Sequence, residues 1–352
     1  MSIFDNAKKA LDAFKTRASG RIQMKVCMMG PRAVGKTTIL TAVFNNTLDD
    51  LGVSTNLQLQ AEGDTRADLT QKKRYLQSVF ANRTDITDKP SAGLAGTATV
   101  NTFDFVFGLK GKEPRIDMEI KDFPGEYVVD HPDDVIRFIN ESSAVFVAID
   151  TPHLMEEGGK YCEVKNKPSA IIDFFKQQSI DAEKLVLFVP LKCERYFHEK
   201  RMDEVLRRVE EVYEDLISGF KANGKVACAV TPILTLGDVE FERFKTTPQG
   251  NIATLSNGCP EEAIYRFRGN NPQYTPTFCM QPLYYMLSFL ASQYERNKKQ
   301  RGFIDKVFSS VFNLFDSDTA LFDEILRMEK NRKTDLPGYK VLCGADLFKY
   351  CK

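Results

Sequence analysis

The sequence has little of several features that would assign it to a class at once. It contains only three histidines, and its eight cysteines include no Cys-x-x-Cys pair, which argues against a histidine-rich metal centre, a zinc site and a disulfide framework. No stretch approaches about 18 uninterrupted apolar residues, so we expect no transmembrane helix. The first 15 residues carry charges and lack the apolar core of a secretory signal. These absences predict a cytoplasmic protein with reduced thiols.

The chain also lacks an excess of either charge. Its 48 basic residues balance 48 acidic ones, whereas proteins that wrap nucleic acid usually carry a basic surplus, so we expect no nucleic-acid partner. Hydrophobic residues make up 43% and charged residues 27%, as in ordinary globular proteins. A length of 352 residues allows one large domain or two ordinary ones.

Hydrophobic periodicity predicts an α/β fold with a mostly parallel sheet, because strands and helices alternate along much of the chain. The expected strands lie at 24–29, 103–109, 116–120, 143–149, 185–191 and 225–231. The expected helices lie at 37–44, 65–82, 168–178, 203–221, 282–297 and 318–330. Alternation around a Gly-Lys turn makes 103–120 an antiparallel hairpin. Residues 83–101 show neither period and read as a loop.

Two further segments are amphipathic. Residues 3–17 place apolar side chains at helical spacing beside several lysines, and residues 303–315 form a wide apolar stripe. Packing against the domain is the expected role of both. Contact with a partner or with a membrane surface is the alternative.

The motif with the most specific chemistry runs from Gly30 to Thr37 and fits G-x-x-x-x-G-K-[ST] between a predicted strand and a predicted helix. Its glycines let the backbone N–H groups form a nest for phosphate at a helix N-terminus. Lys36 would reach the β- and γ-phosphates, and the Thr37 hydroxyl would bind Mg²⁺. The predicted phosphate-binding residues are Gly30, Arg32, Ala33, Val34, Gly35, Lys36, Thr37 and Thr38.

A second motif, Asp122-Phe123-Pro124-Gly125-Glu126, directly follows the second hairpin strand. An Asp at a strand end beside a phosphate loop can hold Mg²⁺ through water, and the Gly125 N–H can approach a γ-phosphate closely. On its own such a motif is also compatible with a simple turn. Its position after the phosphate loop favours a metal role for Asp122.

Together these two motifs, with the hairpin between them, resemble the Ras-like and translation-factor-like GTPases of the TRAFAC class, over about residues 22 to 240. The segments 231–237 and 278–283 are similar to the bacterial double-GTPase type. The resemblance implies a three-layer P-loop NTPase G domain with a mixed, mostly parallel sheet and one antiparallel hairpin strand. It divides the chain into an N-terminal amphipathic helix (1–20), a GTPase-like domain (21–300) with an insertion at about 46–96, and a C-terminal helical extension (301–352).

The family reads guanine with an Asn/Thr-Lys-x-Asp motif, and here that place holds Leu191-Lys192-Cys193-Glu194. The resemblance implies that Lys192 covers the base and that Glu194 accepts its N–H groups. Leu191 lacks the polar side chain that braces this loop. The family's last motif would fall at 231–233, where Pro232 has no N–H to offer the base.

The resemblance also implies three roles in loops. A switch threonine, Thr97 in first place or Thr99 in second, would complete the Mg²⁺ shell with Thr37 and Asp122. Glu126 would position the attacking water, and Lys36 with Gly125 would complete the catalytic set. Arg32 stands where Ras-like proteins have glycine, and we expect it to point outward to solvent or to a partner.

The function implied is a cytoplasmic molecular switch that binds GTP or GDP with Mg²⁺, hydrolyses GTP slowly and acts through protein partners. Three alternatives remain open at this point. One is an ATPase or kinase on the same loop, and another is a nucleotide-binding scaffold with little turnover. The third is a scaffold at the membrane periphery that uses 3–17 and 303–315.

Overall fold

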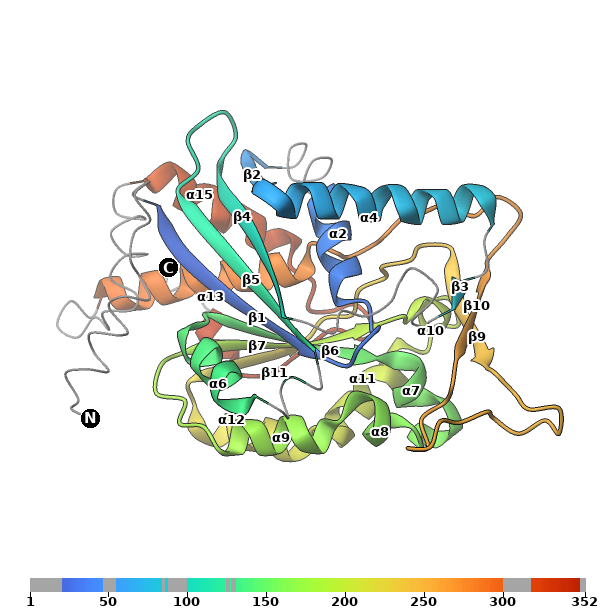
Figure 1. Cartoon of the computed structure of the whole chain (residues 1–352). Coiled ribbons are helices and arrows are strands. Elements are labelled where there is room, and N and C mark those ends of the chain that lie inside the picture. Colours follow the sequence, from blue (N-terminus) through green and yellow to red (C-terminus); the bar gives the residue numbers. More distant parts are fainter. Residues whose placement is uncertain are drawn as a thin grey trace.

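The chain folds into three layers, a mixed β-sheet with helices on both faces (Figure 1). The structure is a computed structural model, and it describes residues 21–46, 55–83, 86–87, 100–124, 127, 131–299 and 318–348. Among these residues the main sheet has eight strands, in the order β11-β8-β7-β6-β1-β5-β4-β2. Their bounds are β1 Ile22–Gly30, β2 Leu57–Ala61, β4 Asn101–Leu109, β5 Ile116–Pro124, β6 Ala144–Asp150, β7 Lys184–Leu191, β8 Val226–Val230 and β11 Lys340–Cys343.

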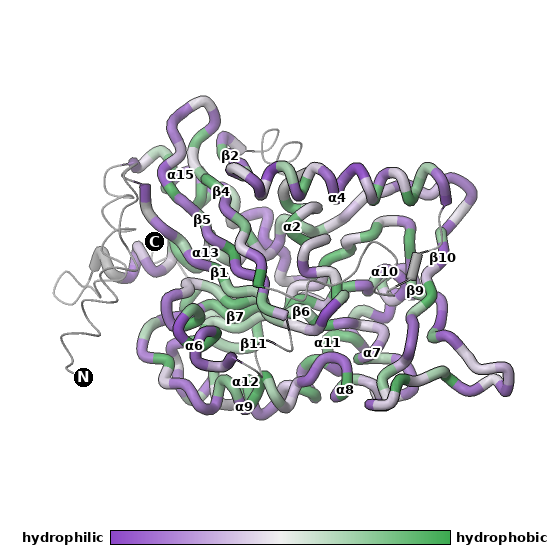
Figure 2. Tube along the Cα trace, viewed as in Figure 1, coloured by the Kyte–Doolittle hydropathy of each residue, from purple (hydrophilic) through white to green (hydrophobic). Residues whose placement is uncertain are grey.

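Strand direction explains where a site can form. Strands β5, β1, β6, β7 and β8 run parallel to one another, so their carboxyl ends meet at one edge of the sheet. Strand β4 pairs antiparallel with β5 and is the expected hairpin strand. The parallel strands are buried on both faces, which is why their sequences read as continuous apolar runs (Figure 2).

Different sets of helices cover the two faces of the sheet. Val26 and Met28 of β1 face the layer that holds α2, α13 and α15, whereas Cys27 and Met29 face the layer that holds α6 to α12. The helix bounds are α2 Lys36–Asn46, α4 Gly63–Asn82, α6 Pro132–Glu141, α7 Thr151–Met155, η2 Glu156–Gly159, α8 Cys162–Asn166, α9 Pro168–Lys176, α10 Glu194–His198, α11 Met202–Val212, α12 Glu214–Asn223, α13 Gln281–Lys299, α15 Thr319–Met328, η3 Glu329–Asn331 and η4 Ala345–Phe348.

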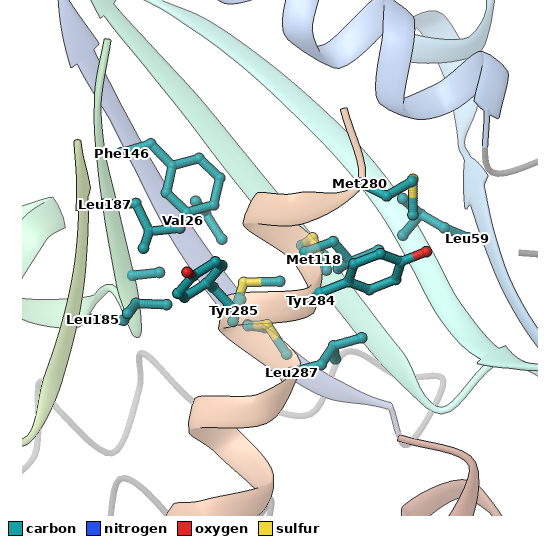
Figure 3. Packing of buried hydrophobic residues seen from close by; sticks show 14 of the residues in the cluster. Val26, Leu59, Met118, Phe146, Leu185, Leu187, Met280, Tyr284, Tyr285 and Leu287 are labelled. Carbon is teal, nitrogen blue, oxygen red and sulfur yellow. The ribbon is translucent and has the colours of Figure 1, made fainter. Parts of the chain in front are cut away.

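The first face is sealed mainly by α13. Figure 3 shows Tyr285 beside Leu185 and Leu187 of β7, while Tyr284 lies toward Met118 of β5. All of these side chains are buried in one cluster. Burial of large aromatic and aliphatic side chains stabilises this layer by about 1.5–3 kcal/mol each. The helix therefore fixes the sheet from which the site's loops emerge.

A second, smaller sheet lies beyond the carboxyl ends of the main strands, in the order β3-β10-β9. It is formed by β3 (Ile86–Thr87), β9 (Val239–Phe244) and β10 (Ala263–Phe267). Helix α4 joins the two parts, because Leu69 belongs to the core of the main sheet and Phe80 packs with the small sheet. Figure 1 shows α4 spanning this distance along one side.

Several elements differ from the sequence prediction. The helix expected at 203–221 is two helices, because Tyr213 leaves helical geometry with φ −107° and ψ 19°. The loop expected at 83–101 contains β3 and the first residue of β4. The small sheet and β2 had no predicted counterpart, and the segment after 318 adds β11 to the main sheet besides its helix. The amphipathic segments 3–17 and 303–315 lie outside the described residues.

Candidate nucleotide site

The loop between β1 and α2 has the shape that a phosphate nest requires. Gly30 adopts φ +145°, and a Cβ there would lie 2.6 Å from the carbonyl oxygen of Ala148 on β6. Gly35 adopts φ +110° and Ala33 φ 59°, so the chain curls before α2 begins at Lys36. Only glycine fits the first of these positions without moving a neighbouring strand. The loop is therefore formed by backbone geometry at the carboxyl edge of the sheet.

Lys36 is the charged centre of this loop. Its Nζ donates to the carbonyl oxygens of Gly30 and Pro31, at 2.8 and 3.0 Å, and the side chain is only 6% exposed. Lys36 therefore folds back over the loop, where its ammonium group faces the volume that phosphates occupy in a nest of this kind. The expectation that Lys36 and the glycines act together is consistent with this geometry.

Asp122 lies beside Lys36, although the two are far apart in sequence. Parallel pairing places Asp122 opposite Met28 on β1, and its Oδ1 is 3.4 Å from Lys36 Nζ. Burial raises the pKa of Asp122, and the charge of Lys36 opposes that rise. Among the described residues Oδ1 has no hydrogen-bond partner. A buried carboxylate oxygen whose only close partner is an ammonium group fits a divalent cation bound between protein and phosphate.

The other phosphate-loop residues differ in how far they are buried. Val34 is buried, Thr37 and Thr38 are half-buried, and Arg32 is exposed, as expected for a side chain directed outward. Thr41 Oγ1 donates to the Thr37 carbonyl at 2.9 Å and so fixes the first turn of α2. The Thr37 hydroxyl and the Asp122 carboxylate would be the metal ligands available among the described residues. Thr97, Thr99, Gly125 and Glu126 lie outside those residues.

The loop after β7 forms the opposite wall of the site. A Cβ on Gly35 would lie 3.9 Å from Leu191 Cδ1, so the turn that is predicted to read the base abuts the phosphate loop. Lys192 follows with φ 58°. Its Nζ donates to Asp150 Oδ2 at 2.7 Å, and the residue is 6% exposed. Leu191 thus contributes apolar packing, as its side chain predicts, where the family pattern has a polar side chain, and Lys192 is held by a carboxylate.

Asp150 was not predicted as a site residue. It ends β6, is fully buried, and accepts from His153 Nδ1 at 2.6 Å as well as from Lys192. Burial raises the pKa of Asp150, but the charges of Lys192 and His153 outweigh it and hold the pKa well below its usual range. Asn166 exchanges two hydrogen bonds with the Asp150 backbone. An ionisable residue directly after the apolar run 143–149 was the sequence signal that could have found it.

Glu194 is buried as well. It opens α10, and its Oε1 accepts from the Leu236 N–H at 2.9 Å, while burial raises its pKa to about 7. The carboxylate expected to read guanine therefore holds the loop after β8 in this structure. In that loop the Ile233 N–H donates to the Pro190 carbonyl, and the Leu234 N–H donates to Thr277. The loop offers the base fewer N–H groups than the family pattern implies.

The chain has a P-loop NTPase fold. The strand order, the nest between β1 and α2, and the Lys36–Asp122 pair at the end of the adjacent strand all agree on this assignment.

Comparisons with known proteins find matches among solved structures alone, at low identity. No protein-family model and no curated protein sequence matches the chain. Among solved structures it is similar to the GTP-bound Ski7 GTPase-like domain of S. cerevisiae, with 12% identity and a TM-score of 0.37 over 66% of this chain. The match covers 45% of that chain, so it spans less than half of the Ski7 structure's length.

Two further similarities are of the same kind. The SRb-GTP/SRX complex of the signal recognition particle receptor from Chaetomium thermophilum matches 61% of this chain and 92% of its own, with 14% identity and a TM-score of 0.34. LeoA, a bacterial dynamin GTPase from ETEC, matches 65% of this chain and 33% of its own, with 15% identity and a TM-score of 0.29. The values are low, and the fold assignment rests on this chain's own geometry.

Within the described residues, no helix is both long enough and apolar enough to cross a membrane.

Proposed function

We propose that the chain binds GTP with Mg²⁺, hydrolyses it slowly and acts as a switch through protein partners in the cytoplasm. The observation that carries the proposal is the arrangement of Lys36 in a backbone nest with the Asp122 carboxylate 3.4 Å from its ammonium group. Phosphoryl transfer requires mainly positioned positive charge and a held metal ion; Lys36 would supply the charge, and Asp122 would help to hold the metal. The parallel pairing of β1 with β5 brings these two residues together.

Each residue of the site would have a distinct role in GTP binding and hydrolysis. The loop N–H groups and Lys36 would bind the β- and γ-phosphates and stabilise the negative charge that develops on the leaving diphosphate. Mg²⁺ would neutralise phosphate charge, and Thr37 with Asp122 would hold it, with Thr97 as the proposed third residue. Glu126 would orient the attacking water. Loss of the γ-phosphate would release the segments on both sides of β4–β5, and a partner would read that change.

A second function, nucleotide binding with weak base selectivity and little turnover, is favoured by one specific observation. Glu194 already accepts the Leu236 N–H, and Lys192 already pairs with Asp150. A base reader whose two polar groups are engaged elsewhere must rearrange or bind the base loosely.

A binding and turnover experiment separates these functions. Purified full-length chain is titrated with GTP, GDP and ATP in Mg²⁺, and phosphate release is measured for each ligand that binds. Lys36→Ala is the binding-deficient variant, and Lys25→Ala is its control, because Lys25 lies on β1, before the loop, and pairs with Glu141. GTP binding with phosphate release supports the switch. Equal affinity for ATP without release supports the scaffold, and no nucleotide binding contradicts both.

A further inference from the structure

The loop after β8, residues 231–236, is held from two sides. On one side it contacts the base-reading turn, through the Leu236 N–H to Glu194 Oε1 and the Cys193 Sγ to the Ile233 carbonyl at 3.5 Å. On the other side it contacts the C-terminal part of the chain. The loop therefore links the proposed nucleobase wall to a segment about 100 residues further along.

Tyr339 makes the contact on the C-terminal side. Its hydroxyl donates to the carbonyl oxygen of Pro232 at 2.6 Å, and the residue is 6% exposed. Burial raises the pKa of Tyr339, so the phenol stays protonated and remains a donor. Its ring also lies edge-on to Phe278, 5.8 Å between centroids. Because Pro232 lacks an N–H, its carbonyl is the only backbone hydrogen-bonding group through which this residue can be fixed.

Neighbouring residues set the position of Tyr339. Gly338 adopts φ +87°, and a Cβ there would lie 3.1 Å from Met202 Cβ and 3.2 Å from Pro232 Cγ. Its N–H donates to Asp203 Oδ1 at 3.2 Å. Lys340 then begins β11 opposite Val230, the last residue before the loop. The pairing of β11 at the edge of the main sheet thus places Tyr339 beside the loop, where its hydroxyl reaches Pro232.

We propose that Tyr339 is a positioning residue for the nucleobase: through Pro232 it holds the loop 231–236 in place, so that the C-terminal segment sets base affinity without touching the phosphates. This inference rests on the proposed nucleotide binding. Removing the hydroxyl leaves a buried carbonyl unsatisfied and loosens the loop. Base binding must then order the loop, which weakens affinity for the base and leaves the phosphate nest as it was.

The test compares two tyrosines that each lose one hydroxyl. Tyr339→Phe removes the bond to Pro232, and Tyr285→Phe removes a bond of the same kind, from a buried tyrosine to the Lys333 carbonyl at 2.5 Å. Affinities for GTP and for inorganic triphosphate, both with Mg²⁺, are measured on the full chain. We expect Tyr339→Phe to weaken GTP about three- to tenfold and to leave triphosphate binding unchanged. Tyr285→Phe leaves both affinities unchanged.

A second pair of variants, one test and one control, perturbs the loop by adding a methyl group beside it. Gly338→Ala inserts a methyl group against Met202 and Pro232, whereas Gly258→Ala, at a similar φ of +82°, meets nothing within 4 Å. Both introduce comparable backbone strain, so only the first is expected to weaken GTP selectively. The selective loss in Gly338→Ala together with that in Tyr339→Phe supports the positioning role.

Each result that contradicts these expectations has a single interpretation. Equal weakening of GTP and triphosphate in Tyr339→Phe shows that the hydroxyl only supports the fold, and unchanged affinities show that the loop does not contact the base. Either result overturns the inference while nucleotide binding stands. A wild-type chain that binds neither ligand overturns the proposed function, and the inference fails with it.

Discussion

The phosphate end and the base end of the site differ in what holds them together. At the phosphate end the geometry comes from backbone conformation, with glycines at φ +145° and +110° and Lys36 bound to two loop carbonyls. At the base end it comes from buried side-chain charge, with Asp150 between Lys192 and His153, and Glu194 on a backbone N–H. The first is ready for an anion, whereas the second is already satisfied internally.

This difference has a chemical consequence. Backbone N–H groups at a helix N-terminus point toward a bound anion, so a phosphate would gain hydrogen bonds from the loop without displacing an ion pair of the base end. A base that approaches Lys192 and Glu194 must compete with existing ion pairs and hydrogen bonds. We therefore expect phosphates to supply most of the affinity, and the base end to decide how selective the site is.

The largest effect is expected from a substitution that disrupts the base end alone. Asp150→Asn preserves the shape of the side chain but removes the buried carboxylate charge that pairs with Lys192 and His153. We expect the free energy of unfolding to fall by about 3–5 kcal/mol, measured by denaturant titration. Asp117→Asn is the control, because Asp117 is also buried but pairs with the partly exposed Arg21. A loss no larger than in the control would show that the Asp150 network contributes little to stability.

The next largest effect is expected from a substitution that disrupts the phosphate end alone. Lys36→Ala removes the ammonium group that would face the phosphates, and we expect GTP and inorganic triphosphate to bind about 100-fold more weakly. Calorimetric titration in Mg²⁺ measures both, with Lys25→Ala as the control that keeps wild-type affinity. Because Lys36 acts on phosphates, the two ligands should lose similar free energy. A much larger loss for GTP would contradict the separation of the two ends.

The same contrast explains what the sequence could predict. The phosphate loop is contiguous, so local spacing was enough to predict it, and Asp122 was marked by its place at the end of an alternating strand. Its position beside Lys36 follows from the parallel pairing of β1 with β5. Asp150 and Lys192 are 42 positions apart. Their contact follows from the parallel pairing of β6 with β7, which no local pattern encodes.

The same limit applies to the edges of the fold. Strand β11 and the small sheet are short, at four to six residues for β11, β9 and β10, and their burial is mixed. In β9 the alternation is interrupted, since Glu242 and Arg243 are both exposed. Such strands form because a neighbouring edge offers unpaired backbone groups, and that context is a property of the folded chain. Tyr339 was missed for the same reason.

The smallest expected effect is a pH dependence of stability that comes from Glu194, at the base end. Burial raises the pKa of Glu194 to about 7 in the folded state, whereas an ordinary glutamate in the unfolded chain titrates near 4.5. Between these values the folded state holds the proton more tightly, so stability is lost as pH rises from about 4.5 to about 7. Glu194→Gln keeps an acceptor for the Leu236 N–H and removes this titration. Relative to wild type, we expect the free energy of unfolding of the variant to increase by about 1–2 kcal/mol as pH rises across that range.

Denaturant unfolding at several pH values measures this difference, and His198 with Glu240 serves as the reference pair. Glu240 is buried and its pKa is lowered, because hydrogen bonds and charge from Arg266 and His198 outweigh its burial. Glu240→Gln should therefore lose stability relative to wild type as pH rises, the opposite sign to Glu194→Gln. If both variants show the same sign, the Glu194 carboxylate is ionised in the folded chain. It would then be available to accept the N–H groups of a guanine base at neutral pH, as the family pattern implies.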